Sequence, residues 1–107
     1  MQEAISDPTG FKAILTDECW DHITARHRQM RSFKALVVET IHEPDAIYLG
    51  KRDPTRRVYR KKYAHVPGVG TSLDLLVFVG NQDGYVATAY FAAYSIRVLG
   101  VLIWPST

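Results

Sequence analysis

The chain has 107 residues, 47% of them hydrophobic, and carries 13 Lys and Arg against 11 Asp and Glu. This length predicts a single domain over residues 1–107, with a core that forms without disulfides or metals. The single cysteine, Cys19, excludes an internal disulfide and a cysteine-based zinc cluster. The sequence has no signal-peptide pattern and no apolar run of roughly 18 residues, so we expect a cytoplasmic protein with no membrane contact.

The first part of the chain predicts a tail, a short strand and a helix. Residues 1–10 are polar, with an Asp-Pro pair and a glycine, which is typical of a flexible tail. FKAIL at 11–15 favours an edge strand. Thr16 precedes two acidic residues and indicates the N-cap of a helix over 17–31.

The rest of the chain predicts a second helix followed by a sheet. The second helix covers 32–42 and ends before Pro44, because the proline ring blocks continuation. The strands of an antiparallel meander are expected at 46–50, 56–64, 72–80 and 85–94, and residues 100–104 form either a last edge strand or a packed tail. The expected fold class is therefore α+β, with one or two N-terminal helices packed on a twisted antiparallel sheet of four to five strands.

The two faces of the first predicted helix carry different chemistry. A helix turns by about 100° per residue, which separates a stripe facing the sheet from the opposite side. The stripe consists of Trp20, Ile23, His27 and Met30. On the opposite side, His22 and Arg26 are an i,i+4 pair that can grip one ligand. His27 is either a satisfied core residue or a group that reaches a site on the sheet.

Two predicted strands carry polar or aromatic faces. Alternation places Thr88 and Tyr90 together, on the same face as Val86. In the preceding hairpin, one face consists of Tyr59, Lys61 and Tyr63. Aromatic rings interleaved with lysine can stack a base and hold a phosphate, although ordinary strand packing explains the tyrosines equally well.

A concentrated basic stretch surrounds this hairpin. Residues 51–62, which include Arg57, carry seven Lys or Arg against one Asp. In a nearly balanced protein, such a segment indicates either a surface for a polyanion or a solvated loop.

The order of these motifs resembles a known nuclease family. The succession ILTDECWDHITARH, EPDAI, a basic tyrosine-bearing hairpin, LDLLVFV…GYVATAY and LIW covers residues 12–104. It is similar to the phage-associated branch of the barnase, EndoU, colicin and RelE-like (BECR-fold) nucleases. The resemblance implies helices on a four-stranded antiparallel sheet and a metal-independent ribonuclease. It implies that the catalytic residues are His22, Arg26, His27, Thr88 and Tyr90.

The chemistry of such a site follows from its residue types. Histidine can move protons near neutral pH, and arginine matches two phosphate oxygens. We expect His22 to transfer a proton and Arg26 with Lys61 to hold the phosphate. Hydroxyls of Thr88 and Tyr90 would orient the scissile group, giving a 2′,3′-cyclic phosphate and a 5′-hydroxyl. The RNA-binding residues would be Arg57, Tyr59, Lys61 and Tyr63.

The expected partners are RNA, either tRNA or mRNA, and an inhibitor (antitoxin) protein, and no cofactor or metal is expected. His22 and His27 diverge on a helix and do not form an i,i+4 zinc pair. The alternative function is a module on the same fold that binds nucleic acid or a protein without turnover. Another alternative is a phage structural or assembly component whose segment Val101–Trp104 packs on another subunit.

Overall fold

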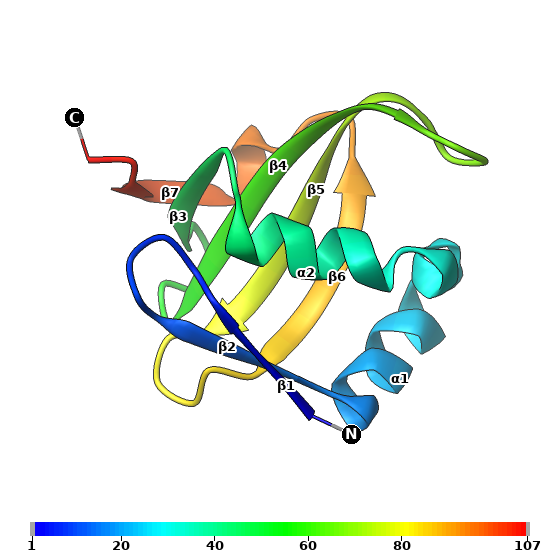
Figure 1. Cartoon of the computed structure of the whole chain (residues 1–107). Coiled ribbons are helices and arrows are strands. Elements are labelled where there is room, and N and C mark those ends of the chain that lie inside the picture. Colours follow the sequence, from blue (N-terminus) through cyan, green and yellow to red (C-terminus); the bar gives the residue numbers. More distant parts are fainter. Residues whose placement is uncertain (1, 107) are drawn as a thin grey trace.

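The computed structural model describes residues 2–106 and contains two helices and seven strands (Figure 1). The helices are α1 (Asp17–Arg26) and α2 (Lys34–His42), with 3-10 turns at Arg28–Ser32 and Ile96–Val98. The strands are β1 (Gln2–Ser6), β2 (Lys12–Thr16), β3 (Ala46–Gly50), β4 (Arg56–Val66), β5 (Gly70–Gly80), β6 (Val86–Ala92) and β7 (Leu99–Trp104).

The main sheet has five strands in the order β6-β5-β4-β3-β7, and every pairing is antiparallel. Strands β3 to β6 form the expected meander, and β7 returns to pair with β3 at the opposite edge from β6. The predicted α+β class and the five-stranded antiparallel sheet are confirmed.

Helix α1 begins as predicted but is shorter than expected, and α2 begins at Lys34 rather than at residue 32. Thr16 is its N-cap, and its hydroxyl accepts the Cys19 N–H at 3.0 Å. The helix stops at Arg26 because His27 leaves helical geometry, with φ −129° and ψ 84°. A 3-10 turn follows and still buries Met30 completely, so the predicted stripe continues beyond the helix itself.

The prediction of a flexible tail over residues 1–10 is wrong for the described residues, and Met1 lies outside them. Strand β1 pairs with β2 in a separate two-stranded sheet, so 11–15 is not an edge strand of the main sheet. The turn between them is held by Asp7, which accepts hydrogen bonds from the backbone of Thr9 and Phe11. Figure 1 shows this hairpin on the same side of the sheet as α2.

The core lies between the sheet and the layer formed by α2 and the β1–β2 hairpin. Strand register places on this side, in successive rows, Arg57, Val79 and Val86; Tyr59, Val77 and Ala89; and Lys61, Leu75 and Phe91. Ile23, Val37 and Ile41 are fully buried against these rows. Each such aliphatic side chain contributes about 1.5–3 kcal/mol on burial.

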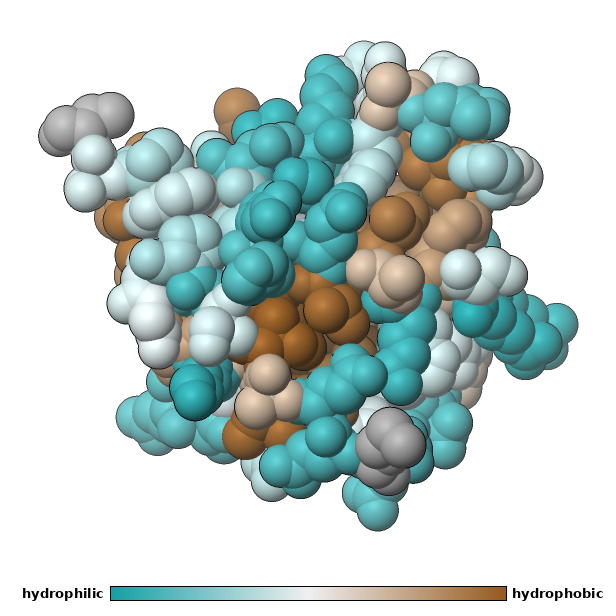
Figure 2. Space-filling model, viewed as in Figure 1, coloured by the Kyte–Doolittle hydropathy of each residue, from teal (hydrophilic) through white to brown (hydrophobic). Residues whose placement is uncertain are grey.

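Apolar surface on this side is interrupted by polar side chains (Figure 2). Brown surface shows in the middle of the view, where α2 passes β1 in Figure 1. A separate pocket there is lined by residues of β1 and α2, among them Ile5, Val38 and His42.

The other side of the sheet, which we call the far face, carries the alternate residues. Its rows are Val58, Phe78 and Thr88; Arg60, Leu76 and Tyr90; and Lys62, Asp74 and Ala92. The connection from β6 to β7 crosses this face, since Ser95 donates a hydrogen bond of 2.8 Å to the buried Asp74. The β6–β7 connection therefore covers part of the far face, and a pocket remains beside this connection.

Candidate functional site

A pocket of about 260 Å³ on the far face contains the two hydroxyl residues predicted for the late strand. Thr88 and Tyr90 line it from β6, and Phe78 from β5. The crossing segment contributes Val98, and the β3–β4 loop closes the remaining side.

Thr88 and Tyr90 reach this pocket because of a β-bulge. Val79 pairs with Val86 and Phe78 with Thr88, so Ala87 is an extra residue in β6. The bulge turns Val86 into the core while Thr88 stays on the far face. The expectation that Val86 shares a face with Thr88 is therefore wrong, whereas the shared face of Thr88 and Tyr90 is confirmed.

The β3–β4 loop brings the pocket its positive charge. Lys51, Arg52 and Arg56 line the pocket, and all three are exposed. The loop folds tightly over Gly50, where an added Cβ would lie 2.4 Å from the Asp53 carbonyl oxygen, so only glycine fits. Asp53 is the one acid in the lining, and its carboxylate lies 3.6 Å from the Arg56 side chain.

Asp53 is held as an anion by its own loop. Hydrogen bonds from the hydroxyl and backbone N–H of Thr55 lower the pKa of this carboxyl, and the charge of Arg56 adds to the effect. The cationic side chains outnumber this anion, so the loop favours a negatively charged ligand.

Tyr90 stands at the centre of a row of rings. The His27 ring lies 5.2 Å from it, centre to centre, and the Phe78 ring lies 5.7 Å away on the same face of the sheet. Burial raises the pKa of the Tyr90 hydroxyl, which therefore stays protonated at neutral pH and can donate a hydrogen bond. His27 is half-buried and lies against Tyr90 of β6, as the sequence suggested.

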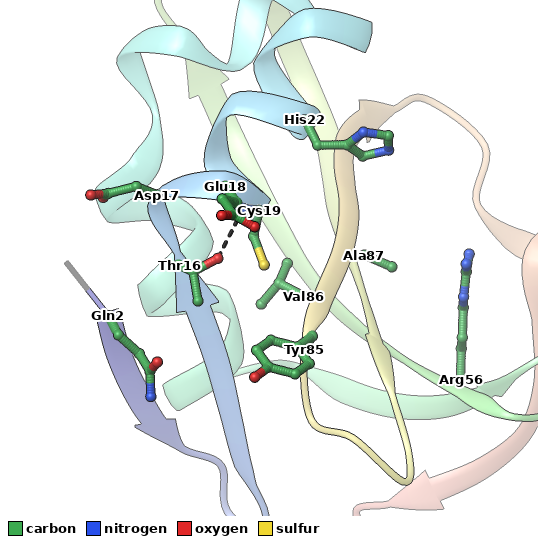
Figure 3. A pocket seen from close by; sticks show the side chains of 10 residues that line it. All are labelled: Gln2, Thr16, Asp17, Glu18, Cys19, His22, Arg56, Tyr85, Val86 and Ala87. Atoms are coloured by element: carbon green, nitrogen blue, oxygen red, sulfur yellow. Dashed lines mark hydrogen bonds between the residues drawn. The ribbon is translucent and has the colours of Figure 1, made fainter.

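His22 lies in a neighbouring, larger pocket of about 910 Å³ (Figure 3). This pocket sits over the start of β6, lined by Tyr85, Val86 and Ala87, beside the first turn of α1. Arg56 lines both pockets, so they adjoin at this residue. In Figure 3, His22 and Arg56 extend on either side of Ala87.

Charge divides this second pocket. Asp17 and Glu18 line it at the start of α1, and Arg56 lines it near the far face. The Arg56 end of the pocket therefore favours a negatively charged group, and the end with the two carboxylates does not. Arg26 is exposed and is not part of the lining of either pocket among the described residues.

The side chains predicted to bind RNA on the hairpin lie on the helix side of the sheet, away from both pockets. Tyr59 is fully buried and donates to Asp7 at 2.5 Å. Arg57 donates to the same carboxylate at 2.9 Å, and its guanidinium lies 3.9 Å from the centre of the Phe11 ring. These two residues cannot meet a base or a phosphate without breaking this network.

Lys61 and Tyr63 are also engaged on the helix side. The Lys61 ammonium donates to the Glu43 carbonyl at 2.6 Å, and the Tyr63 hydroxyl donates to Glu39 at 2.7 Å. The role of Lys61 as a phosphate ligand is therefore not supported by its position, and Tyr63 belongs to the packing of α2.

Sequence reasoning missed Arg56 and Phe78. Alternation does put neighbouring arginines on opposite faces of β4, but it cannot tell which face the helices cover. Phe78 sits in a run of apolar residues from Leu75 to Val79 that looks buried on both faces.

Comparison with protein-family models, curated proteins and solved structures finds no match to this chain. Among residues 2–106, no helix is long and apolar enough to cross a membrane. In the same part of the chain, no three His, Cys, Asp or Glu side chains gather where they could hold a metal ion.

Proposed function

We propose that this protein is a metal-independent endoribonuclease that cuts RNA in the groove formed by the two pockets adjoining at Arg56. The observation that supports it is the shared lining: Arg56 belongs to the pocket of His22 and also to the pocket of Thr88 and Tyr90. An imidazole, a guanidinium and two hydroxyls are the groups that RNA transesterification needs.

In the proposed reaction, His22 accepts the proton of the ribose 2′-hydroxyl as that oxygen bonds to phosphorus. Arg56 takes the place expected for Arg26 and Lys61 and neutralises the phosphorane, while Thr88 and Tyr90 donate hydrogen bonds to its oxygens. The bond to the 5′-oxygen breaks, and the leaving oxygen takes up a proton. The products are a 2′,3′-cyclic phosphate and a 5′-hydroxyl.

His27 is proposed to act on the leaving-group side. Its ring packs on Tyr90, so it either supplies the proton or fixes the tyrosine in place. Two substitutions separate these roles: His27→Phe keeps a ring against Tyr90 but has no proton to give, and His27→Ala removes both. Equal loss of activity in the two variants indicates a proton donor, whereas retained activity in His27→Phe indicates a positioning residue.

The proposal is tested by incubating the protein with tRNA and mRNA in EDTA. Wild type should cut, and His22→Ala and Thr88→Ala should each lose activity. For His22 we expect a loss of about 10²–10⁴-fold, the usual contribution of general acid–base catalysis. Arg26→Ala is the matched control on the same helix and should cut normally. An uncut RNA with wild type, or a loss of less than about threefold in His22→Ala, removes this mechanism.

A binding module without turnover is the second candidate. It is favoured by the far-face pocket, whose lining has cations and rings but neither histidine. In that case RNA binds in a salt-dependent manner and stays intact, since phosphate contacts give affinity without chemistry.

A further inference from the structure

We infer that Phe78, beside Tyr90, is a stacking platform for one unpaired nucleobase, so that the far-face pocket selects single-stranded RNA. The inference rests on the proposed function for the choice of RNA as the ligand. Its own observations are the ring geometry, the cationic wall and the size of the pocket.

The Phe78 and Tyr90 rings are stacked against each other. Their centres are 5.7 Å apart and their planes differ by 21°, so they are nearly parallel. Carbon atoms in contact lie about 3.5–4.0 Å apart, so a centre distance this large means that the rings are displaced sideways. Neither ring therefore covers the other completely, and both residues line the pocket as half-buried side chains.

The cations stand beside these rings. Lys51, Arg52 and Arg56 line the same pocket as Phe78. Proteins that bind single strands combine a positively charged groove with aromatic side chains on which bases stack. The sequence suggested this combination on the hairpin face of Tyr59 and Tyr63, and the structure provides it on the opposite face of the sheet.

The pocket volume of about 260 Å³ limits what can enter. It lies just below the range of about 300–1,000 Å³ that is typical of pockets for drug-sized ligands, so it can take one planar base but not a duplex. A base inside a duplex is covered on both faces, whereas an unpaired base can be splayed out onto an aromatic ring.

The test is binding of a 2′-O-methyl pentanucleotide, which cannot be cut because its 2′-oxygen is blocked. Phe78→Leu keeps an apolar side chain but removes the ring and should weaken binding about 5- to 150-fold, the usual contribution of one stacked base. Phe78→Tyr keeps the ring and should bind as wild type. Tyr94→Leu, at a ring that is 87% exposed, is the matched control and should have no effect.

A series of pentanucleotides, each lacking one base, locates the stacked position in the unaltered protein. Removing the base at one position should weaken binding to wild type but should not change binding to Phe78→Leu, because the ring and the base contribute only as a pair. Equal binding by wild type and Phe78→Leu, or abasic effects that are the same in both proteins, overturns the inference. If binding depends on Phe78 but natural RNA stays uncut, the nuclease proposal is contradicted and the stacking role of Phe78 is supported.

Discussion

The two neighbouring arginines of β4 show how one strand position decides a role. The Arg57 side chain is 14% exposed and is bound to the carboxylate of Asp7, which has no exposed side-chain surface. The Arg56 side chain is 44% exposed and lines both pockets of the groove. We therefore assign Arg57 to stability and propose Arg56 for ligand binding.

Substituting each arginine by alanine separates these roles. Arg57→Ala leaves the buried Asp7 carboxylate without its cationic partner and should lower the free energy of unfolding by about 3–5 kcal/mol. Arg56→Ala should change it by no more than about 0.5 kcal/mol, as is usual for a surface residue. Urea unfolding and RNA cleavage, measured on both variants, give the comparison. Greater destabilisation by Arg56→Ala would contradict this assignment.

The Asp7 network also predicts a pH dependence of stability. Burial is the largest influence on the Asp7 carboxyl and raises its pKa. The hydrogen bonds from Thr9 and Tyr59 and the charge of Arg57 together outweigh burial, so the pKa lies below its usual value of 3.8. A carboxyl with a lowered pKa stabilises the fold above the unfolded-state pKa, and this stabilisation is lost as pH falls through the folded-state pKa.

We therefore expect wild type to be more stable than Asp7→Asn at pH 7, with a difference that shrinks below about pH 4. Chemical unfolding of both proteins from pH 7 to pH 2 measures this difference. A difference that stays constant over the whole range would show that the charge of Asp7 does not contribute.

At the level of elements, the most informative wrong prediction is the flexible tail in place of β1. Its five residues alternate weakly, and only Ile5 is a large apolar side chain, so their composition resembles a tail. The strand forms because Ile5 enters the core and because Asp7 holds the turn to β2. Such support comes from distant residues such as Tyr59 and cannot be seen in the local sequence.

The role of β1 is tested by Ile5→Ala. Ile5 is only 7% exposed, so its truncation should lower the free energy of unfolding by about 2–5 kcal/mol. Ser6→Ala changes an exposed neighbour and is the control, with little effect expected. Thermal or urea unfolding of both variants suffices, and an Ile5→Ala protein as stable as wild type would mean that the strand adds nothing to the core.

Two further features could not be predicted from the sequence, for physical reasons. The stripe of α1 keeps its spacing through Met30 although the helix stops at Arg26, because a 3-10 turn carries the chain onward. The bulge at Ala87 has no glycine or proline to mark it, so simple alternation assigned Val86 to the wrong face. The N-cap at Thr16 was predictable because its interaction is local.

At the level of the whole molecule, the order of elements was enough to predict the fold class, since two helices followed by a meander favour one arrangement. The groove was only partly predictable. Thr88 and Tyr90 share a face, His27 lies against Tyr90, and His22 lines the adjoining pocket. The face of the sheet that carries the groove could not be predicted, because both faces of β4 carry charged side chains and only tertiary packing buries one of them.

The central proposal is that residues from α1 and β6 act on one phosphate, and a double-mutant cycle tests it most directly. The measurement is kcat/KM for RNA cleavage in EDTA by wild type, His22→Ala, Thr88→Ala and the double variant. Groups that act in one transition state are strongly non-additive, so the double variant should be only slightly slower than the slower single variant. Losses that multiply, or single variants that cut as fast as wild type, would contradict a shared site.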